Sequence, residues 1–344
     1  MGFFKQVKDI TPRVGNQVES LRKESAKKEK SARLEKSLMR LQYEGKAERV
    51  KSCGTLFAYA YIFSEDRLVM HRANFCRERL CPMCALQKTR QVYAKVSRVM
   101  DVIEAERPEL TPLFLTLTVR NCKAEELTGT LDMMFRSWGR VTNNKRVKRL
   151  VPGFFRSLEV TYNEESDTYH PHIHAILLVP PNYFTNPKDY MPTQRWVATW
   201  RKAMRLDYDP VCDIRAIGSG EGQQSRADAV AEVAKYTVKD TDYLKDDDAL
   251  TDNLVQVFGA ALKGRRLYAF GGLMKEVAKR LKLQDLDELE PGNVTDENGK
   301  VLRKDIDYVL IFYRWSQERS RYECEGPDVE WYKEAYEKHK TDSG

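Results

Sequence analysis

Two β-rich stretches in the middle of the chain constrain its fold most. Residues 154–163 and 169–179 are rich in aromatic, β-branched and aliphatic side chains, and the polar residues 164–167 stand between them. This arrangement predicts an antiparallel hairpin with a slightly long turn. A run with period-two alternation at 113–119 precedes the hairpin, and a short run at 211–217 follows it. Both runs are typical of further strands of the same sheet.

Helical spacing of apolar residues separates these strands. Leu127, Leu131, Met134 and Trp138 fit one face of a helix, and residues 195–205 and 227–240 also favour helices. The predicted order is therefore β-α-β-β-α-β-α. Such an order suits an α+β fold, in which helices cover an antiparallel sheet.

The 344 residues suggest two domains, or one domain with appendages. Composition changes along the chain predict four segments: a charged helical N-terminal arm at 1–50, a cysteine-rich segment at 51–90, the sheet-and-helix domain at 91–283 and an acidic C-terminal segment at 284–344. The cysteine-rich segment opens with an expected hairpin, whose strands are residues 56–63 and 67–75. A helix is expected after it, around residues 92–103.

Charge is distributed unevenly along the chain. Residues 281–344 hold 10 Lys and Arg against 16 Asp and Glu, a balance of −6, whereas the rest holds 48 against 35, or +13. A basic body suits a phosphate-rich partner, because neutralised phosphates release counterions. The alternative is a solvated, highly charged surface. No apolar run reaches about 18 residues and none resembles a secretory signal at the start, so we expect a cytoplasmic protein without a membrane span.

Three of the seven cysteines crowd together in Cys76-x4-Cys81-Pro-x-Cys84. In a cytosolic chain such spacing favours a metal over disulfides. Zinc takes four ligands in a tetrahedron, so a fourth is needed. We expect Cys53, with His71 as the alternative. Four protein ligands leave no open position, so this Zn²⁺ would be structural; the competing interpretation is a group of buried free thiols.

Three of the five histidines lie in Tyr169-His170-Pro171-His172-Ile173-His174. Alternate residues of a strand share a face, so His172 and His174 point the same way. The hairpin places Glu159 roughly opposite His172. Two imidazoles and a carboxylate suit Mg²⁺ or Mn²⁺ as a catalytic metal, with His170 as an alternative third ligand. A pair of surface or core histidines is the competing interpretation.

The stretch from Ala231 to Asp240 holds a third group of reactive side chains. On one helix, Glu232, Tyr236 and Lys239 would share a face. Tyr236 is then a candidate nucleophile, Lys239 a phosphate-neutralising cation and Glu232 a candidate general base. An ordinary amphipathic helix gives the same pattern. The catalytic interpretation of this stretch is therefore supported only in combination with the histidine pair. The sequence contains neither a P-loop nor a Gly-x-Ser-x-Gly elbow, which excludes those ATPase and hydrolase types.

These motifs, in this order, resemble the replication initiators of rolling-circle plasmids from Gram-positive bacteria, which belong to the HUH (His–hydrophobe–His) endonuclease superfamily. The resemblance covers roughly residues 45–283. It is carried by the four stretches at 75–84, 113–121, 172–174 and 235–242. One departure is His170, since a histidine is not expected two positions before the pair.

The resemblance implies a specific reaction. The initiator binds the plasmid's double-strand origin and nicks one strand in an exposed single-stranded loop. Tyr236 attacks the phosphorus and stays linked to the 5′ phosphate, while the released 3′ hydroxyl primes synthesis. Glu232 then activates water for the terminating cleavage, and His172 and His174 hold the metal that polarises the scissile phosphate.

Partners follow from the same resemblance. They are origin DNA, as duplex and exposed single strand, and a host helicase with the replication machinery; a homodimer is left open. Candidate contacts to the DNA backbone are Lys235 and three residues of a basic run before the hairpin, Arg146, Lys148 and Arg149. A solvated loop explains that run equally well.

Two other functions stay open at this point. One is a transposase or mobilisation relaxase with the same histidine site. The other, from a different class, is a non-catalytic zinc-containing DNA-binding regulator. A nicking assay on supercoiled plasmid, with and without Mn²⁺, distinguishes all three.

Overall fold

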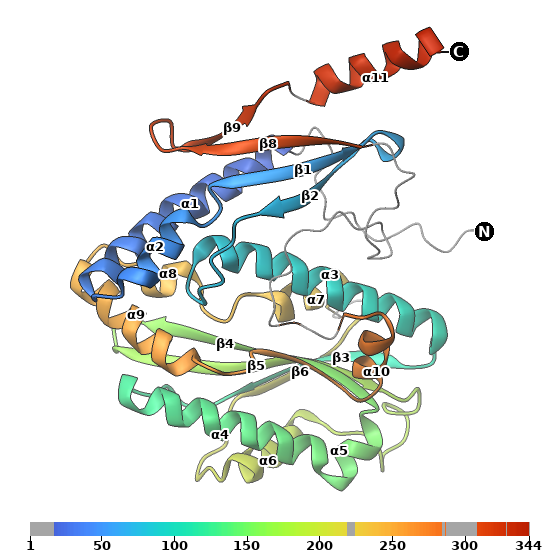
Figure 1. Ribbon diagram of the computed structural model, residues 1–344. Helices are drawn as coiled ribbons and strands as arrows, with labels where there is room; N and C mark the ends of the chain where they lie inside the picture. The colour runs from blue at the N-terminus through green and yellow to red at the C-terminus, as the bar shows by residue number, and fades with distance from the viewer. Residues whose placement is uncertain (1–16, 219–223, 284–285, 287–307, 328, 344) are drawn as a thin grey trace. The chain divides into compact units, whose positions relative to one another are not determined.

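A computed structural model describes residues 17–218, 224–283, 286, 308–327 and 329–343. The chain divides into two compact units (Figure 1). One takes the described residues of 1–87 and 289–344, and the other those of 88–288. The second unit nearly coincides with the expected 91–283 domain. The first combines the arm, the cysteine-rich segment and the C-terminal segment, which the sequence suggests as separate pieces.

The first unit is built on a four-stranded antiparallel sheet in the order β2-β1-β8-β9. Its elements are α1 (Gln17–Arg40), α2 (Glu44–Ser52), β1 (Leu56–Ile62), the 3-10 turn η2 (Phe63–Glu65), β2 (Arg67–Ala73), β8 (Tyr308–Ser316), β9 (Arg321–Glu325) and α11 (Val329–Ser343). The β1–β2 hairpin is as predicted. In Figure 1 the red strand β8 lies beside the blue strand β1, so the C-terminal segment completes a sheet that begins near the N-terminus.

The apolar residues of α1 explain why the charged arm folds. Leu34 and Leu38 are buried, as the weak apolar stripe of this helix requires. The ring of Tyr322 on β9 packs 4.8 Å from that of Phe57 on β1, centroid to centroid. The Tyr322 hydroxyl also donates a hydrogen bond to the carbonyl of Gly54. These aromatic contacts join the two ends of the chain within one core.

The second unit holds a five-stranded antiparallel sheet in the order β6-β3-β5-β4-β7. Its strands are β3 (Thr111–Thr118), β4 (Gly153–Asn163), β5 (Thr168–Val179), β6 (Cys212–Ala216) and β7 (Tyr268–Gly271). Its helices are α4 (Ala124–Asn143), α5 (Lys145–Leu150), α6 (Thr193–Met204), α7 (Arg226–Ala234), α8 (Asp240–Tyr243), α9 (Asp248–Leu262) and α10 (Gly272–Arg280), together with most of α3 (Pro82–Glu106). The α+β class and the predicted order are confirmed.

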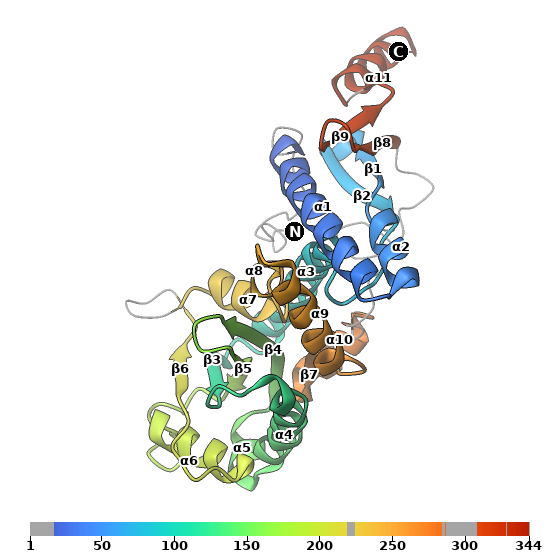
Figure 2. The same cartoon turned by 90° about the vertical axis from the view of Figure 1, so that its left-hand side faces the viewer.

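Helices cover both faces of this sheet. Figures 1 and 2 show α4 and α6 on one face and α7 on the other. The predicted face of α4 is buried, and the indole nitrogen of Trp200 on α6 donates to the carbonyl of Thr118 at 2.8 Å. Arg226, at the start of α7, pairs with Asp101 and Glu104 of α3. The central hairpin β4–β5 is thus packed between helices on both faces of the sheet.

One local prediction was wrong. The helix expected over 227–240 ends at Ala234, and residues 235–239 form an irregular connection before α8. Thr237 and Val238 are buried in this connection, which lets the chain turn toward β4 instead of continuing as a helix. The basic run at 145–150 forms the short helix α5, capped by Asn144, so the alternative interpretation as a solvated loop does not hold. Among the described residues, no helix is both long and apolar enough to cross a membrane.

Candidate active site

The β4–β5 hairpin sets the register of the site. Glu159 on β4 lies directly opposite His172 on β5, and Ser157 lies opposite His174. Because side chains alternate along a strand, the two histidines share one face of the sheet with the carboxylate. The expected placement of Glu159 is confirmed.

One carboxylate oxygen meets both imidazoles. Glu159 Oε2 lies 3.0 Å from Nε2 of His172 and 3.0 Å from Nε2 of His174. The other ring nitrogens have their own hydrogen-bond partners. His172 Nδ1 lies 3.2 Å from the carbonyl of His170, and His174 Nδ1 lies 3.0 Å from the hydroxyl of Thr116. These contacts at Nδ1 orient each ring so that Nε2 faces the carboxylate.

The electrostatics of Glu159 depend on its neighbours. Its side chain is almost fully buried, at 4% exposure. Burial alone would raise the pKa of this carboxyl. Hydrogen bonds from His172, His174 and Lys239 outweigh burial and hold the pKa well below its ordinary value. Glu159 is therefore an ionised carboxylate at neutral pH, as a ligand for a hard cation must be.

This donor set fits a divalent metal ion. The ligand atoms of Glu159, His172 and His174 all lie within 4.8 Å of one another. Two imidazole nitrogens and one carboxylate oxygen leave further positions for water or phosphate, which Mg²⁺ and Mn²⁺ keep in their coordination shells. Among the described residues, the group does not extend to His170, whose pKa is lowered by burial and by the neighbouring His172. Of the two candidates for third ligand, the geometry favours Glu159.

The connection that carries Tyr236 is held on both sides of the tyrosine. The hydroxyl of Tyr268 donates to the carbonyl of Lys235 at 2.9 Å, and the backbone N–H of Val160 donates to the carbonyl of Thr237 at 2.7 Å. Val160 directly follows Glu159 on β4. The backbone of Tyr236 is thus fixed beside the strand that supplies the carboxylate, although no helix carries it.

Residues on either side of Tyr236 reach the same cluster. Glu232 Oε1, in the last turn of α7, lies 3.7 Å from His174 Nε2, and its other oxygen pairs with the ammonium of Lys235 at 2.5 Å. Lys239 Nζ lies 3.0 Å from Glu159 Oε1. Burial alone would lower the pKa of Lys239, but pairing with Glu159 raises it above its ordinary value, so Lys239 stays protonated.

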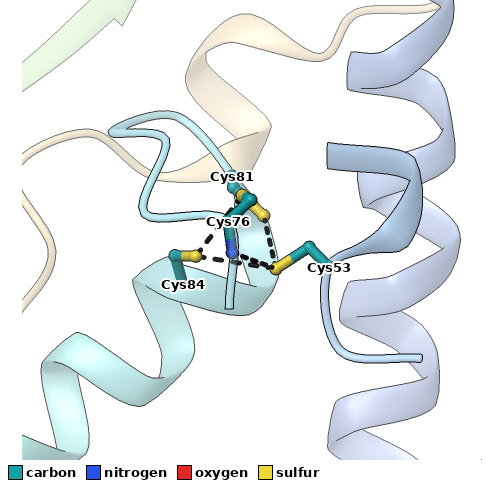
Figure 3. A group of neighbouring side chains, drawn as sticks. All are labelled: Cys53, Cys76, Cys81 and Cys84. Carbon is teal, nitrogen blue, oxygen red and sulfur yellow. Dashed lines mark hydrogen bonds between the residues drawn. The ribbon is translucent and has the colours of Figure 1, made fainter. Parts of the chain in front are cut away.

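The four expected cysteines form a second cluster, in the first unit (Figure 3). Sulfur–sulfur distances are 3.6 Å for Cys53–Cys84, Cys76–Cys84 and Cys53–Cys81. A tetrahedral zinc with Zn–S bonds of about 2.3 Å requires sulfurs about 3.8 Å apart, so this set fits Zn²⁺. Backbone N–H groups of Cys76 and Arg77 also point at sulfurs, each at 3.3 Å.

A lysine missed by the sequence analysis supports this cluster. The ammonium of the buried Lys28 on α1 donates to the carbonyl of Cys53 at 2.7 Å and to that of Lys51 at 2.6 Å. Burial lowers the pKa of Lys28, while the charges of the neighbouring thiols oppose that change. Nothing in the local sequence of the arm distinguishes Lys28 from its charged neighbours. Thr116, by contrast, could have been found, since a strand paired with β5 must place a residue opposite His174.

Two of the candidate DNA contacts have internal partners. The guanidinium of Arg146 donates to the carbonyls of Lys188 and Tyr190, and that of Arg149 pairs with Asp189 at 2.7 Å. Lys148 is exposed on α5. Arg146 and Arg149 thus brace the loop after β5, which the sequence analysis did not anticipate.

Comparisons with known proteins agree with the resemblance. The family described as "Replication protein" matches residues 67–323. The protein named "Protein rep" from Bacillus amyloliquefaciens is 38% identical over 283 residues, covering 78% of this chain and 82% of that protein. A "Protein rep" from Streptococcus pneumoniae is 34% identical over 257 residues, covering 74% and 78% respectively. No solved structure matches the chain. The prediction made from the four motifs is confirmed at this level: the chain belongs to the replication protein family, that of the plasmid replication initiators.

Proposed function

We propose that this replication protein is a single-tyrosine HUH endonuclease. In this proposal it binds the double-strand origin of its plasmid, nicks one strand through Tyr236 and ends each round of synthesis with a second cleavage. The observation that carries the proposal is the position of Tyr236 between Glu232 and Lys239, both of which reach the cluster of Glu159, His172 and His174.

The chemistry of the first cleavage is a transesterification. The hydroxyl oxygen of Tyr236 forms a bond to the scissile phosphorus, the bond from phosphorus to the 3′ oxygen breaks, and the proton of the tyrosine is lost to a base or to water. The phosphotyrosine bond retains the free energy of the phosphodiester. The released 3′ oxygen takes up a proton and, as a 3′ hydroxyl, serves as the primer.

The residues around Tyr236 have separate roles in this proposal. Glu159, His172 and His174 would hold Mg²⁺ or Mn²⁺, which supplies positive charge to the oxygens of the scissile phosphate. Lys239, kept protonated by Glu159, adds a second positive charge beside the tyrosine. Thr116 orients the ring of His174. Hydrogen bonds hold the backbone carbonyls of Lys235 and Thr237 in place. The backbone of Tyr236 is therefore already ordered, so attack on the phosphorus costs less conformational entropy.

Termination needs a second nucleophile, because Tyr236 is already consumed. Water is the simplest, and Glu232 is a carboxylate at the edge of the cluster that can accept its proton. The four cysteines would hold a structural Zn²⁺ that takes no part in this chemistry, since no ligand position is left open there.

The test uses supercoiled plasmid that carries the protein's own origin. Incubation with Mn²⁺ should give open circles with protein attached to the 5′ end, and EDTA should prevent it. Proteolysis followed by mass spectrometry should then find the nucleotide on Tyr236. Cleavage without a covalent adduct, or an adduct on another residue, would contradict the proposal.

A further inference from the structure

The loop after β5, residues 180–191, is unusually well braced for a surface loop. Buried Asp189 accepts hydrogen bonds from the side chains of Arg149 at 2.7 Å and Asn186 at 2.8 Å. The hydroxyl of Tyr183 donates to the carbonyl of Met191 at 3.0 Å, and Arg146 of α5 donates to two further carbonyls of the loop. The loop is thus held in one conformation from inside the fold.

This rigid loop presents two aromatic rings to solvent. Phe184 is 50% exposed and Tyr190 is 41% exposed, and their ring centroids lie 6.3 Å apart. The buried ring of Tyr183 supports both, at 5.1 Å from Phe184 and 5.8 Å from Tyr190. A single exposed ring is ordinary. Two neighbouring rings fixed over a third form a platform that the packing of the loop does not require.

Positively charged side chains lie in the loop and on the helix that braces it. Lys188 lies in the same loop and Lys145 and Lys148 lie on the bracing helix α5, all three exposed. Within the described part of the chain, none of these three ammonium groups pairs with a carboxylate. Arg149, although paired with Asp189, keeps 62% of its side chain exposed. Aromatic rings among cations suit unpaired nucleic acid, because bases stack on the rings and phosphates pair with the cations.

The strand between the platform and the histidines sets their separation. Pro180 follows β5 six positions beyond His174. At 3.3 Å per residue, the loop begins about 20 Å along the sheet from the cluster. Stacked nucleotides rise about 3.4 Å each, so this span corresponds to about six nucleotides.

We infer that Phe184 and Tyr190, with Lys148 and Lys188, form a stacking platform that binds the unpaired origin strand beyond the C-terminal end of β5. The inference rests on the proposed function for its reaction, but the platform itself is a single-strand-binding surface that is testable without cleavage. Because every base has an aromatic face, the platform tolerates any sequence and fixes the path of the strand.

The test measures binding of a fluorescein-labelled dT20 oligonucleotide by anisotropy in the full-length protein. Phe184→Ala and Tyr190→Ala should each raise the Kd for dT20 by about five-fold or more, and the double variant should raise it further. Phe184→Trp should bind like the parent. Tyr43→Ala, which removes an equally exposed ring from the other unit, is the matched control and should change nothing.

Charge and strand specificity are measured in the same assay. Lys148→Gln and Lys188→Gln should each lower the slope of log Kd against log salt by about 0.7, the value for one phosphate of a single strand. A 20-base-pair duplex should lose less than two-fold in affinity in the aromatic variants. An unchanged Kd for dT20 in the double variant would overturn the inference. Equal losses of affinity for dT20 and for the duplex would also overturn it, as would a parent protein that fails to bind dT20.

The outcome separates the platform from the proposed function. Nicking of origin plasmid by the parent protein is measured in parallel. Loss of dT20 binding in the variants together with no nicking by the parent would retain the platform and reject the endonuclease. Nicking by the parent with unchanged dT20 binding in the variants would do the opposite.

Discussion

Lys239 and Glu159 are joined by an ion pair of 3.0 Å between Nζ and Oε1, while the second oxygen of the same carboxylate faces both histidines at 3.0 Å. One buried carboxylate thus links the sheet to the connection that carries Tyr236. Glu159 is negative and needs positive charge around it, and Lys239 and the histidines meet that need from different elements. The ion pair joins the segment that carries Tyr236 to the cluster of candidate metal ligands.

Tyr236→Phe should abolish nicking and the covalent adduct, because the variant lacks the attacking oxygen. Binding of origin DNA should stay within about two-fold, since no charge is lost. The measurement is relaxation of supercoiled origin plasmid. Tyr43→Phe, at an exposed tyrosine of the first unit, is the control that keeps full cleavage. Tyr243 is buried on α8 and is not an alternative nucleophile in the folded protein. Residual relaxation by Tyr236→Phe would reject the assignment.

Thr116→Val should weaken Mn²⁺ binding about ten-fold, because His174 loses the hydroxyl that orients its ring. Thr116→Ser keeps the hydroxyl and should bind like the parent. Glu159→Ala and His174→Ala remove ligands and should bind Mn²⁺ more weakly still. Titration calorimetry with Mn²⁺ alone measures all four variants, and equal affinity of Thr116→Val and Thr116→Ser would show that the hydroxyl has no role.

The purified protein should contain about one zinc per chain. Cys81→Ser should lose it and destabilise the first unit, since binding energy at a structural site is folding energy. Lys28→Met should keep the zinc but bind it about ten-fold more weakly, because the carbonyl of Cys53 loses its donor and the thiolates lose a nearby positive charge. Lys23→Met, on the exposed side of α1, is the control. Chelator competition measures each affinity, and metal-free protein with unchanged stability would contradict the prediction.

Glu232→Gln should separate initiation from termination. In the proposed reaction the first nick uses Tyr236, so its rate should stay a substantial fraction of the parent's. The terminating cleavage needs a base for water, so multimeric single strands should accumulate. A plasmid with two tandem origins shows read-through past the second origin only if termination fails. If Glu232 serves only as the ion-pair partner of Lys235, the variant will initiate and terminate like the parent.

The cysteines outside the cluster should differ in reactivity toward a thiol reagent at pH 8. Burial raises the pKa of the Cys212 thiol to about 12, so about one molecule in ten thousand carries the reactive thiolate at that pH. Burial also raises the pKa of Cys122. Cys324, half-buried on β9, should therefore react first, and EDTA should add four cluster thiols. Counting modified cysteines by intact mass checks the order, and rapid labelling of Cys212 would show that the second unit opens readily.

Local sequence patterns were enough to predict the central hairpin, the order of elements in the second unit and the two clusters of candidate metal ligands. Alternation along a strand is a local property, so it placed His172 and His174 on one face, and a short turn allowed Glu159 to be counted back to His172. The short spacing of Cys76, Cys81 and Cys84 likewise requires these three side chains to lie near one another. These features depend on neighbours a few residues apart.

Tertiary structure decided the rest. The 235–239 connection leaves the helical path because Thr237 pairs with Val160 and Lys239 with Glu159, and neither partner can be known before β4 is placed. Strand β8 pairs with β1, and Lys28 donates a hydrogen bond to the carbonyl of Cys53. Both interactions join residues that are far apart in the sequence. Intrinsic helix propensities differ by under about 1 kcal/mol per residue for residues other than proline, and such long-range contacts override them.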